Sequence, residues 1–116
     1  MIAKAVEALA EKYAGIALTP EMCGPQGEDS PTWWLVEGLA LRLEQVEEDM
    51  RRGVAEYQRA CAKVLSNLDA GPAGEVYQLR QHGEFNSTNM DAMILARYHL
   101  IEQLRHAVHV ATKVGA

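Results

Sequence analysis

The sequence predicts an all-α protein, a helical bundle with two long antiparallel helices, an N-terminal helix and one short helix. Composition is the first observation, since the 116 residues include 17 Ala and 12 Leu but only 4 Ile, 4 Thr and 1 Phe. Ala and Leu favour helices, whereas β-branched and aromatic residues favour strands. The second observation is that apolar residues recur every three or four positions over long stretches. A chain of this length is typical of one domain, so we expect residues 1–116 to form a single helical domain.

The first expected helix covers residues 2–14. Its apolar residues are Ile2, Val6, Leu9 and Tyr13, which lie on one face of a helix. Gly15 then provides a left-handed stop. The segment 19–30 is rich in Gly, Pro and acidic residues, and at about 12 residues it is long for a compact helical protein. We therefore expect a mobile loop there.

The second expected helix covers residues 31–69, with Ser30 as its N-cap and Pro31 at its first position. Its apolar stripe keeps spacings of three or four throughout. The stripe consists of Leu35, Leu39, Leu43, Val46, Met50, Val54, Tyr57, Cys61, Val64 and Leu68. One helix of this length would span about 58 Å, so it either breaks near Gly53 or buries its overhang against another chain. Because the stripe keeps its phase across Gly53, we favour a continuous helix and a homodimer.

Two further helices are expected, a short one at 73–82 and a long one at 88–114. Thr88 and Asp91 resemble a capping box at the start of the long one. Its apolar face is formed by Met90, Met93, Ile94, Tyr98, Ile101, Leu104, Val108 and Ala111. We expect the two long helices to pack antiparallel.

The net charge of −5 disfavours direct binding to nucleic acid, which depends on Lys and Arg. No apolar run is long enough to span a membrane, and the N-terminal residues do not resemble a signal peptide. The two cysteines, Cys23 and Cys61, lack metal-site or disulfide spacing. We interpret Cys61 as buried and Cys23 as an exposed, unreactive thiol. These features predict a cytoplasmic protein that does not bind membranes.

The pair Trp33 and Trp34 marks a candidate partner-binding surface, together with Leu41. On the helix 31–69, Trp34, Gly38 and Leu41 share a second face away from the main stripe. Either the first helix packs on this face, or a partner protein binds there. Both interpretations stay open, and the ground for the second is that tryptophan is enriched among the residues that dominate binding energy.

A histidine stripe on the last helix is a candidate metal site, formed by His99, Glu102, His106 and His109. Imidazole and carboxylate groups bind divalent ions such as zinc or iron. The Glu-x-x-His unit that di-iron bundles repeat on two helices is absent from this helix. The alternatives are a solvated face with a Glu102–His106 pair, or a partner contact.

A run of acidic residues, Glu44, Glu47, Glu48 and Asp49, follows Leu43. The spacing Glu44-x-x-Glu47 resembles half of the magnesium-binding pattern of all-α nucleotide pyrophosphohydrolases. That resemblance implies Mg²⁺ held against phosphates, which also requires a second acidic pair that this chain lacks. The alternative is helical ion pairing between Glu47 and Arg51 and between Glu48 and Arg52.

The function predicted from these features is a non-enzymatic protein–protein interaction module without a cofactor. It would be an adaptor, regulator or inhibitor that acts through its helix faces, as a homodimer. One alternative is a metal-dependent protein, such as a phosphohydrolase, that uses the histidine stripe with Glu44, Glu47 and Glu48. A second alternative is a small acidic inhibitor protein from a virus or mobile element.

Overall fold

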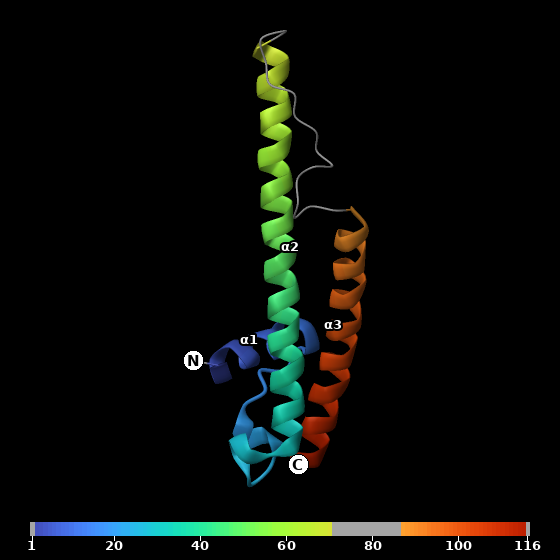
Figure 1. The fold of residues 1–116 in the computed structure, drawn as a ribbon. Helices are drawn as coiled ribbons and strands as arrows, with labels where there is room; N and C mark the ends of the chain where they lie inside the picture. The colour runs from blue at the N-terminus through green and yellow to red at the C-terminus, as the bar shows by residue number, and fades with distance from the viewer. Residues whose placement is uncertain (1, 71–86, 116) are drawn as a thin grey trace. The chain divides into compact units, whose positions relative to one another are not determined.

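The computed structural model describes residues 2–70 and 87–115, and every regular element among them is helical. The helices are α1 (Ile2–Ala14), α2 (Pro31–Ala70) and α3 (Ser87–Gly115), as Figure 1 shows. Two short 3-10 helices, η1 (Pro20–Cys23) and η2 (Gly27–Asp29), lie between α1 and α2 along the chain. The all-α class is confirmed, and the expected short helix at 73–82 lies outside the described residues. No stretch of the described helices is sufficiently long and apolar to cross a bilayer.

The chain divides into two compact units, one formed by Met1–Val46 with Ala96–Ala116 and the other by Glu47–Leu95. Each unit contains part of α2 and part of α3. In the first unit, residues early in α2 share a hydrophobic cluster with residues late in α3. In the second, Gly53 of α2 lies against Met90, which is early in α3. The two long helices are therefore antiparallel, as the sequence predicts. The single domain over residues 1–116 stays a prediction.

Two helix ends have the caps that the sequence predicts. Gly15 follows α1 with φ of 78°, and its N–H donates to Glu11 O at 3.1 Å. This left-handed conformation suits glycine because glycine has no Cβ. At the start of α2, Ser30 Oγ accepts a hydrogen bond from Thr32 N at 3.2 Å, with Pro31 at the first helical position. Both caps satisfy backbone groups that a helix end leaves unpaired.

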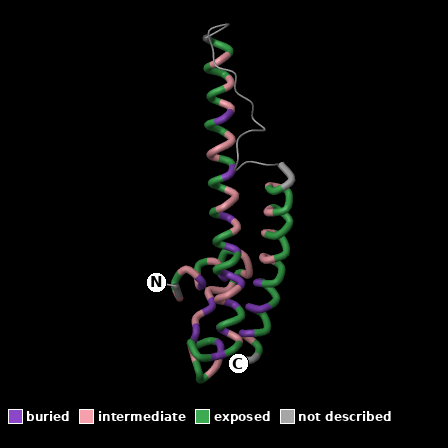
Figure 2. Tube along the Cα trace, viewed as in Figure 1, coloured by how far each residue is buried: buried purple, intermediate pink, exposed green. Residues whose placement is uncertain are grey.

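The core of the first unit forms around Trp33, whose side chain is 1% exposed and is among its largest fully buried side chains. In this unit the buried residues lie on α1, on the segment between α1 and α2, on the first half of α2 and on the last half of α3 (Figure 2). The cluster contains Val6, Ala10, Leu18, Cys23, Trp33, Val36, Leu39, Ala40, Leu43, Leu104, Ala107, Val108 and Ala111. Outside the cluster, Arg97 links α3 to α1, since its Nη2 donates to Tyr13 Oη at 3.1 Å. Three helical segments and the segment after α1 thus form the core of the first unit, and a hydrogen bond joins α3 to α1 beside it.

The buried face of α2 differs from the predicted stripe. Leu35 and Leu68 are 55% and 71% exposed, and Val54 is also exposed. The small residues Ala40, Gly53 and Ala60 are buried instead. A pattern of large apolar residues cannot detect this face, because a close approach between helices requires small side chains. On α3, Leu104, Val108 and Ala111 are buried as predicted, whereas Ile94 and Tyr98 are exposed.

The segment 19–30 is folded around Cys23, which is buried and not exposed as the sequence predicted. The helix η1 turns Pro20 and Cys23 inward, and Cys23 Sγ donates to Thr19 O at 3.7 Å. Burial, and next the charge of Glu21, raise the pKa of the Cys23 thiol above its ordinary value. Cys61, predicted to be buried, is only half-buried. The mobility of this segment stays a prediction.

Candidate interaction surface

The first half of α2 carries exposed apolar side chains around Gly38. The four residues that adjoin Gly38 on the helix surface, three and four positions away, are Trp34, Leu35, Leu41 and Arg42. All four are exposed, including 58% of Trp34 and 38% of Leu41. A Cβ added to Gly38 would meet no atom within 4 Å. We call Trp34, Leu35, Gly38, Leu41 and Arg42 the Gly38 notch.

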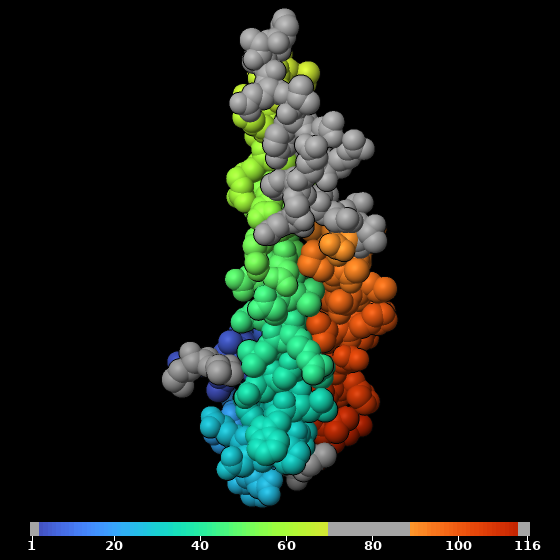
Figure 3. Space-filling model, viewed as in Figure 1, coloured from blue at the N-terminus to red at the C-terminus, as the bar shows by residue number. Residues whose placement is uncertain are grey.

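No other part of the described first unit fills the floor of this notch, since the space above Gly38 is open. The interpretation in which α1 packs on this face is therefore wrong. α1 contributes Val6 and Ala10 to the core on the Trp33 side of α2. Figure 3 shows the first turns of α2 at the molecular surface, beside the segment that precedes them.

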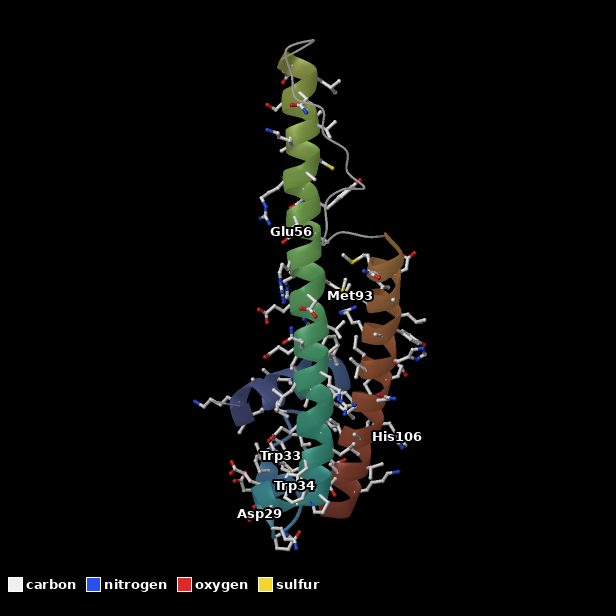
Figure 4. All side chains as sticks on the ribbon, viewed as in Figure 1. Asp29, Trp33, Trp34, Glu56, Met93 and His106 are labelled. Atoms are coloured by element: carbon white, nitrogen blue, oxygen red, sulfur yellow. The ribbon has the colours of Figure 1, made fainter. Side chains whose placement is uncertain are left out.

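Trp34 is held in place by the turn before α2. Its Nε1 donates to Glu28 O at 2.7 Å, and Glu28 belongs to η2. This turn is itself anchored, because Ser30 Oγ donates to Cys23 O at 3.3 Å. Asp29 and Trp34 lie together where η2 leads into α2 (Figure 4). The one polar atom of the indole, Nε1, is therefore already hydrogen-bonded. A partner that covers the rings would not leave this donor unpaired, so binding carries no penalty for desolvating it.

Trp33 has the opposite environment from its neighbour. Its rings fill the core of the first unit, and its Nε1 donates to Glu37 Oε2 at 3.1 Å. Successive residues of a helix point about 100° apart, which places one indole inside and the next outside. Of the three residues predicted to bind a partner, Trp34 and Leu41 are exposed together. Trp33 supports the surface from beneath and offers no ring to a partner.

The histidine stripe does not form a cluster with metal-ligand geometry in the structure. Among residues 2–70 and 87–115, no group of three or more His, Cys, Asp or Glu side chains is placed to hold a metal ion. Glu102 Oε1 accepts a hydrogen bond from Arg105 Nη1 at 3.2 Å, where the sequence predicted a pair with His106. The His99 ring lies edge-on to Tyr98, with centroids 5.6 Å apart. His106 and His109 are exposed.

The acidic run on α2 also pairs differently from the prediction. Arg52 Nη2 lies 2.6 Å from Asp49 Oδ1, where the sequence predicted Glu48 as the partner. Glu47 is buried, whereas Glu44 and Glu48 are exposed. The Asp49–Arg52 pair borders a hollow of about 390 Å³ in the second unit. This hollow is lined by Asp49, Arg52, Gly53, Asn89, Ala92 and Met93.

Comparison of the chain with models of known protein families, with curated proteins and with solved structures finds no match. The structure by itself shows the fold class, an all-α helical bundle. The sequence pattern predicted Trp34 and Leu41 as surface residues and assigned Leu35 to the core stripe, whereas Leu35 is also exposed. It also missed the contribution of Glu28, because a backbone carbonyl leaves no signal in a sequence.

Proposed function

We propose that this protein is a non-enzymatic protein–protein interaction module that presents the Gly38 notch to a partner. The observation that carries the proposal concerns two residues one turn apart. The Trp34 indole is exposed and fixed by a hydrogen bond, and the space above Gly38 is open. Tryptophan that stands over a recess is a common anchor in protein interfaces, and contiguous exposed apolar groups mark such interfaces. An adaptor, regulator or inhibitor would use the surface in the same way. The proposal includes the cytoplasm as the location and no cofactor.

The first test of this proposal is the double variant Trp34→Ala with Leu41→Ala. We expect it to lose at least about tenfold in the amount of partner retained from a lysate of the source cells, because two anchors are removed. The matched control is Ile94→Ala with Leu95→Ala, which removes two other exposed apolar side chains from α3. Quantitative mass spectrometry of the retained proteins, with immobilised wild type and both variants, measures the difference.

The control variant should retain the same partner as the wild type, and circular dichroism should report near-equal helicity for all three proteins. If the wild type and both variants retain the same proteins in the same amounts, the notch is not a binding surface. If Trp34→Ala with Leu41→Ala unfolds, these residues belong to the core and the proposal is also contradicted.

The proposed module is a homodimer, with the second half of α2 as its interface. Leu65 and Leu68 are exposed, at 62% and 71%, one turn apart on the same face as Val54 and the half-buried Cys61. Exposed apolar residues repeated along one helix favour pairing with a second copy. The wild type should therefore have the mass of two chains in native mass spectrometry.

Replacing Leu65 and Leu68 by Glu is expected to convert the dimer to a monomer. Two carboxylates on each copy would face each other across the interface, and glutamate keeps the helix propensity of leucine. Since both side chains are largely exposed, the cost to an isolated chain should stay below about 1 kcal/mol. Light scattering after size exclusion, over a range of concentrations, measures the mass. A wild type that is monomeric at all concentrations, or a variant that remains dimeric, contradicts the assignment.

A further inference from the structure

Two acidic residues, Glu28 and Asp29, lie at the Trp34 end of the Gly38 notch. Between Lys12 and Arg42 the sequence holds four carboxylates, Glu21, Glu28, Asp29 and Glu37, and no Lys, Arg or His. Glu21, Glu28 and Asp29 are exposed. The hydrogen bond from Trp34 Nε1 to Glu28 O, 2.7 Å long, fastens the turn with Glu28 and Asp29 to the indole. The Trp34 end of the notch thus has an acidic rim, formed by Glu28 and Asp29, and this hydrogen bond fixes its position.

The opposite end of the notch carries a basic residue. Arg42 lies four positions after Gly38 and is exposed. A ligand that lies along the notch therefore meets carboxylates near Trp34 and a guanidinium near Leu41. This charge distribution attracts cations to one end and repels anionic surfaces from it. Anionic lipid headgroups and nucleic acid phosphates are disfavoured by the same rim.

The shape of the notch suits an α-helix as its ligand. Trp34, Gly38 and Leu41 lie on one face of α2 at the first, fifth and eighth positions of a helical repeat. Two helices pack when a side chain of one inserts between side chains of the other. Gly38 supplies the recess, and Trp34 and Leu35 supply one wall. A helix with apolar residues at the same spacing could place one of them above Gly38.

We propose that the partner segment is a basic amphipathic helix, with an apolar side chain over Gly38 and Lys or Arg residues against Glu28 and Asp29. This inference rests on the proposed function, because it names the class of partner for the same surface. The apolar stripe supplies most of the binding energy, and the basic residues fix the direction in which the helix lies. The same charges speed association and make it sensitive to salt.

The probe is a synthetic peptide of about 18 residues made only of Leu and Lys, with Leu on one helical face. A second peptide has Glu in place of each Lys, and a third has the Leu and Lys order scrambled. Isothermal titration of the full-length protein measures the dissociation constants. We expect the amphipathic Leu/Lys peptide to bind at least about tenfold more tightly than either of the others.

Four variants assign this binding to the notch. Trp34→Ala should weaken it at least about tenfold, and Glu28→Gln with Asp29→Asn about three- to tenfold. Glu7→Gln with Glu11→Gln removes the same charge from α1, so it controls for net charge and should change the affinity less than twofold. Arg42→Glu should tighten binding about two- to fivefold, because it extends the acidic rim.

The outcomes separate this inference from the proposed function. If the Leu/Glu peptide binds as tightly as the Leu/Lys peptide and both require Trp34, the notch is a binding surface but its partner is not basic. Equal losses in the Glu28/Asp29 and Glu7/Glu11 variants also overturn the basic partner. If Trp34→Ala changes no affinity, both the inference and the proposed function fail. Tighter binding to phosphatidylserine vesicles than to the Leu/Lys peptide overturns the inference in favour of a membrane surface.

Discussion

Replacing Trp33 by alanine is expected to destabilise the first unit by about 3–5 kcal/mol, the usual cost of removing a large aromatic side chain from a core. Trp33 is 1% exposed and lies among residues from α1, the segment after it and both long helices. The substitution would leave a cavity between these elements. Proteins of this size are stable by only about 5–15 kcal/mol, so the loss is a large fraction of the total. The midpoint of thermal unfolding should fall by about 15–30 °C.

The matched control is the same substitution at the next residue. Trp34 is 58% exposed, and its hydrogen bond to Glu28 O is also exposed, so water can replace it. Trp34→Ala should therefore cost about 1 kcal/mol or less. Urea unfolding followed by circular dichroism measures both values. Equal losses at the two positions would contradict the assignment of one indole to the core and the other to the surface. Trp33→Phe should recover part of the lost stability, since it refills part of the cavity.

The sequence predicts the helices well because their ends depend on local chemistry. Ser30 caps α2 through its own hydroxyl, and Gly15 adopts the left-handed conformation that ends α1. Both effects arise within a few residues of the chain. The continuity of α2 through Gly53 is a similar case, since an interior glycine weakens a helix by only about 1 kcal/mol. The bundle with antiparallel long helices follows from the same periodicity.

The buried faces are less predictable, because they depend on what approaches the helix from outside. Gly53 lies so close to α3 that a Cβ there would be 3.2 Å from Met90 Cε. A pattern based on large apolar residues places Val54 in the core instead, and Val54 is exposed. The same limitation applies to Trp33 and Trp34, because adjacent residues of one type cannot be assigned to core or surface from their identity alone. Only their opposite environments in the fold show which one a partner could contact.

The segment before α2 illustrates a third limit. Its Gly, Pro and acidic residues indicate a loop, but they do not reveal that Cys23 turns into the core or that Glu28 O accepts from Trp34. Both contacts depend on the tertiary arrangement of residues that are several positions apart. The ion pair of Arg52 is a related error. The sequence predicted Glu48, four positions earlier, as its partner, whereas Arg52 pairs with Asp49, three positions earlier. Both spacings are favourable on a helix.

Filling the Gly38 notch is expected to change stability and binding in opposite directions. Alanine in a helix interior is about 1 kcal/mol more favourable than glycine, and a Cβ at position 38 would meet no atom within 4 Å. Gly38→Ala should therefore stabilise the protein by about 0.5–1 kcal/mol. The same methyl group occupies the floor on which the proposed partner helix rests. It should weaken binding of the Leu/Lys peptide about threefold, and Gly38→Leu at least about tenfold.

The opposite signs make this pair of variants more decisive than a loss of function alone, because a misfolded variant cannot become more stable. Gly53→Ala is the matched control. Its Cβ would lie 3.2 Å from Met90 Cε, so the helix-propensity gain is offset by a shift of that flexible side chain. It should stabilise the protein less than Gly38→Ala and leave peptide affinity unchanged. If Gly38→Leu folds stably and binds like the wild type, no helix approaches α2 at Gly38. Gly38 would then have no role in recognition, and a partner that contacts Trp34 and Leu41 would not be a helix packed over Gly38.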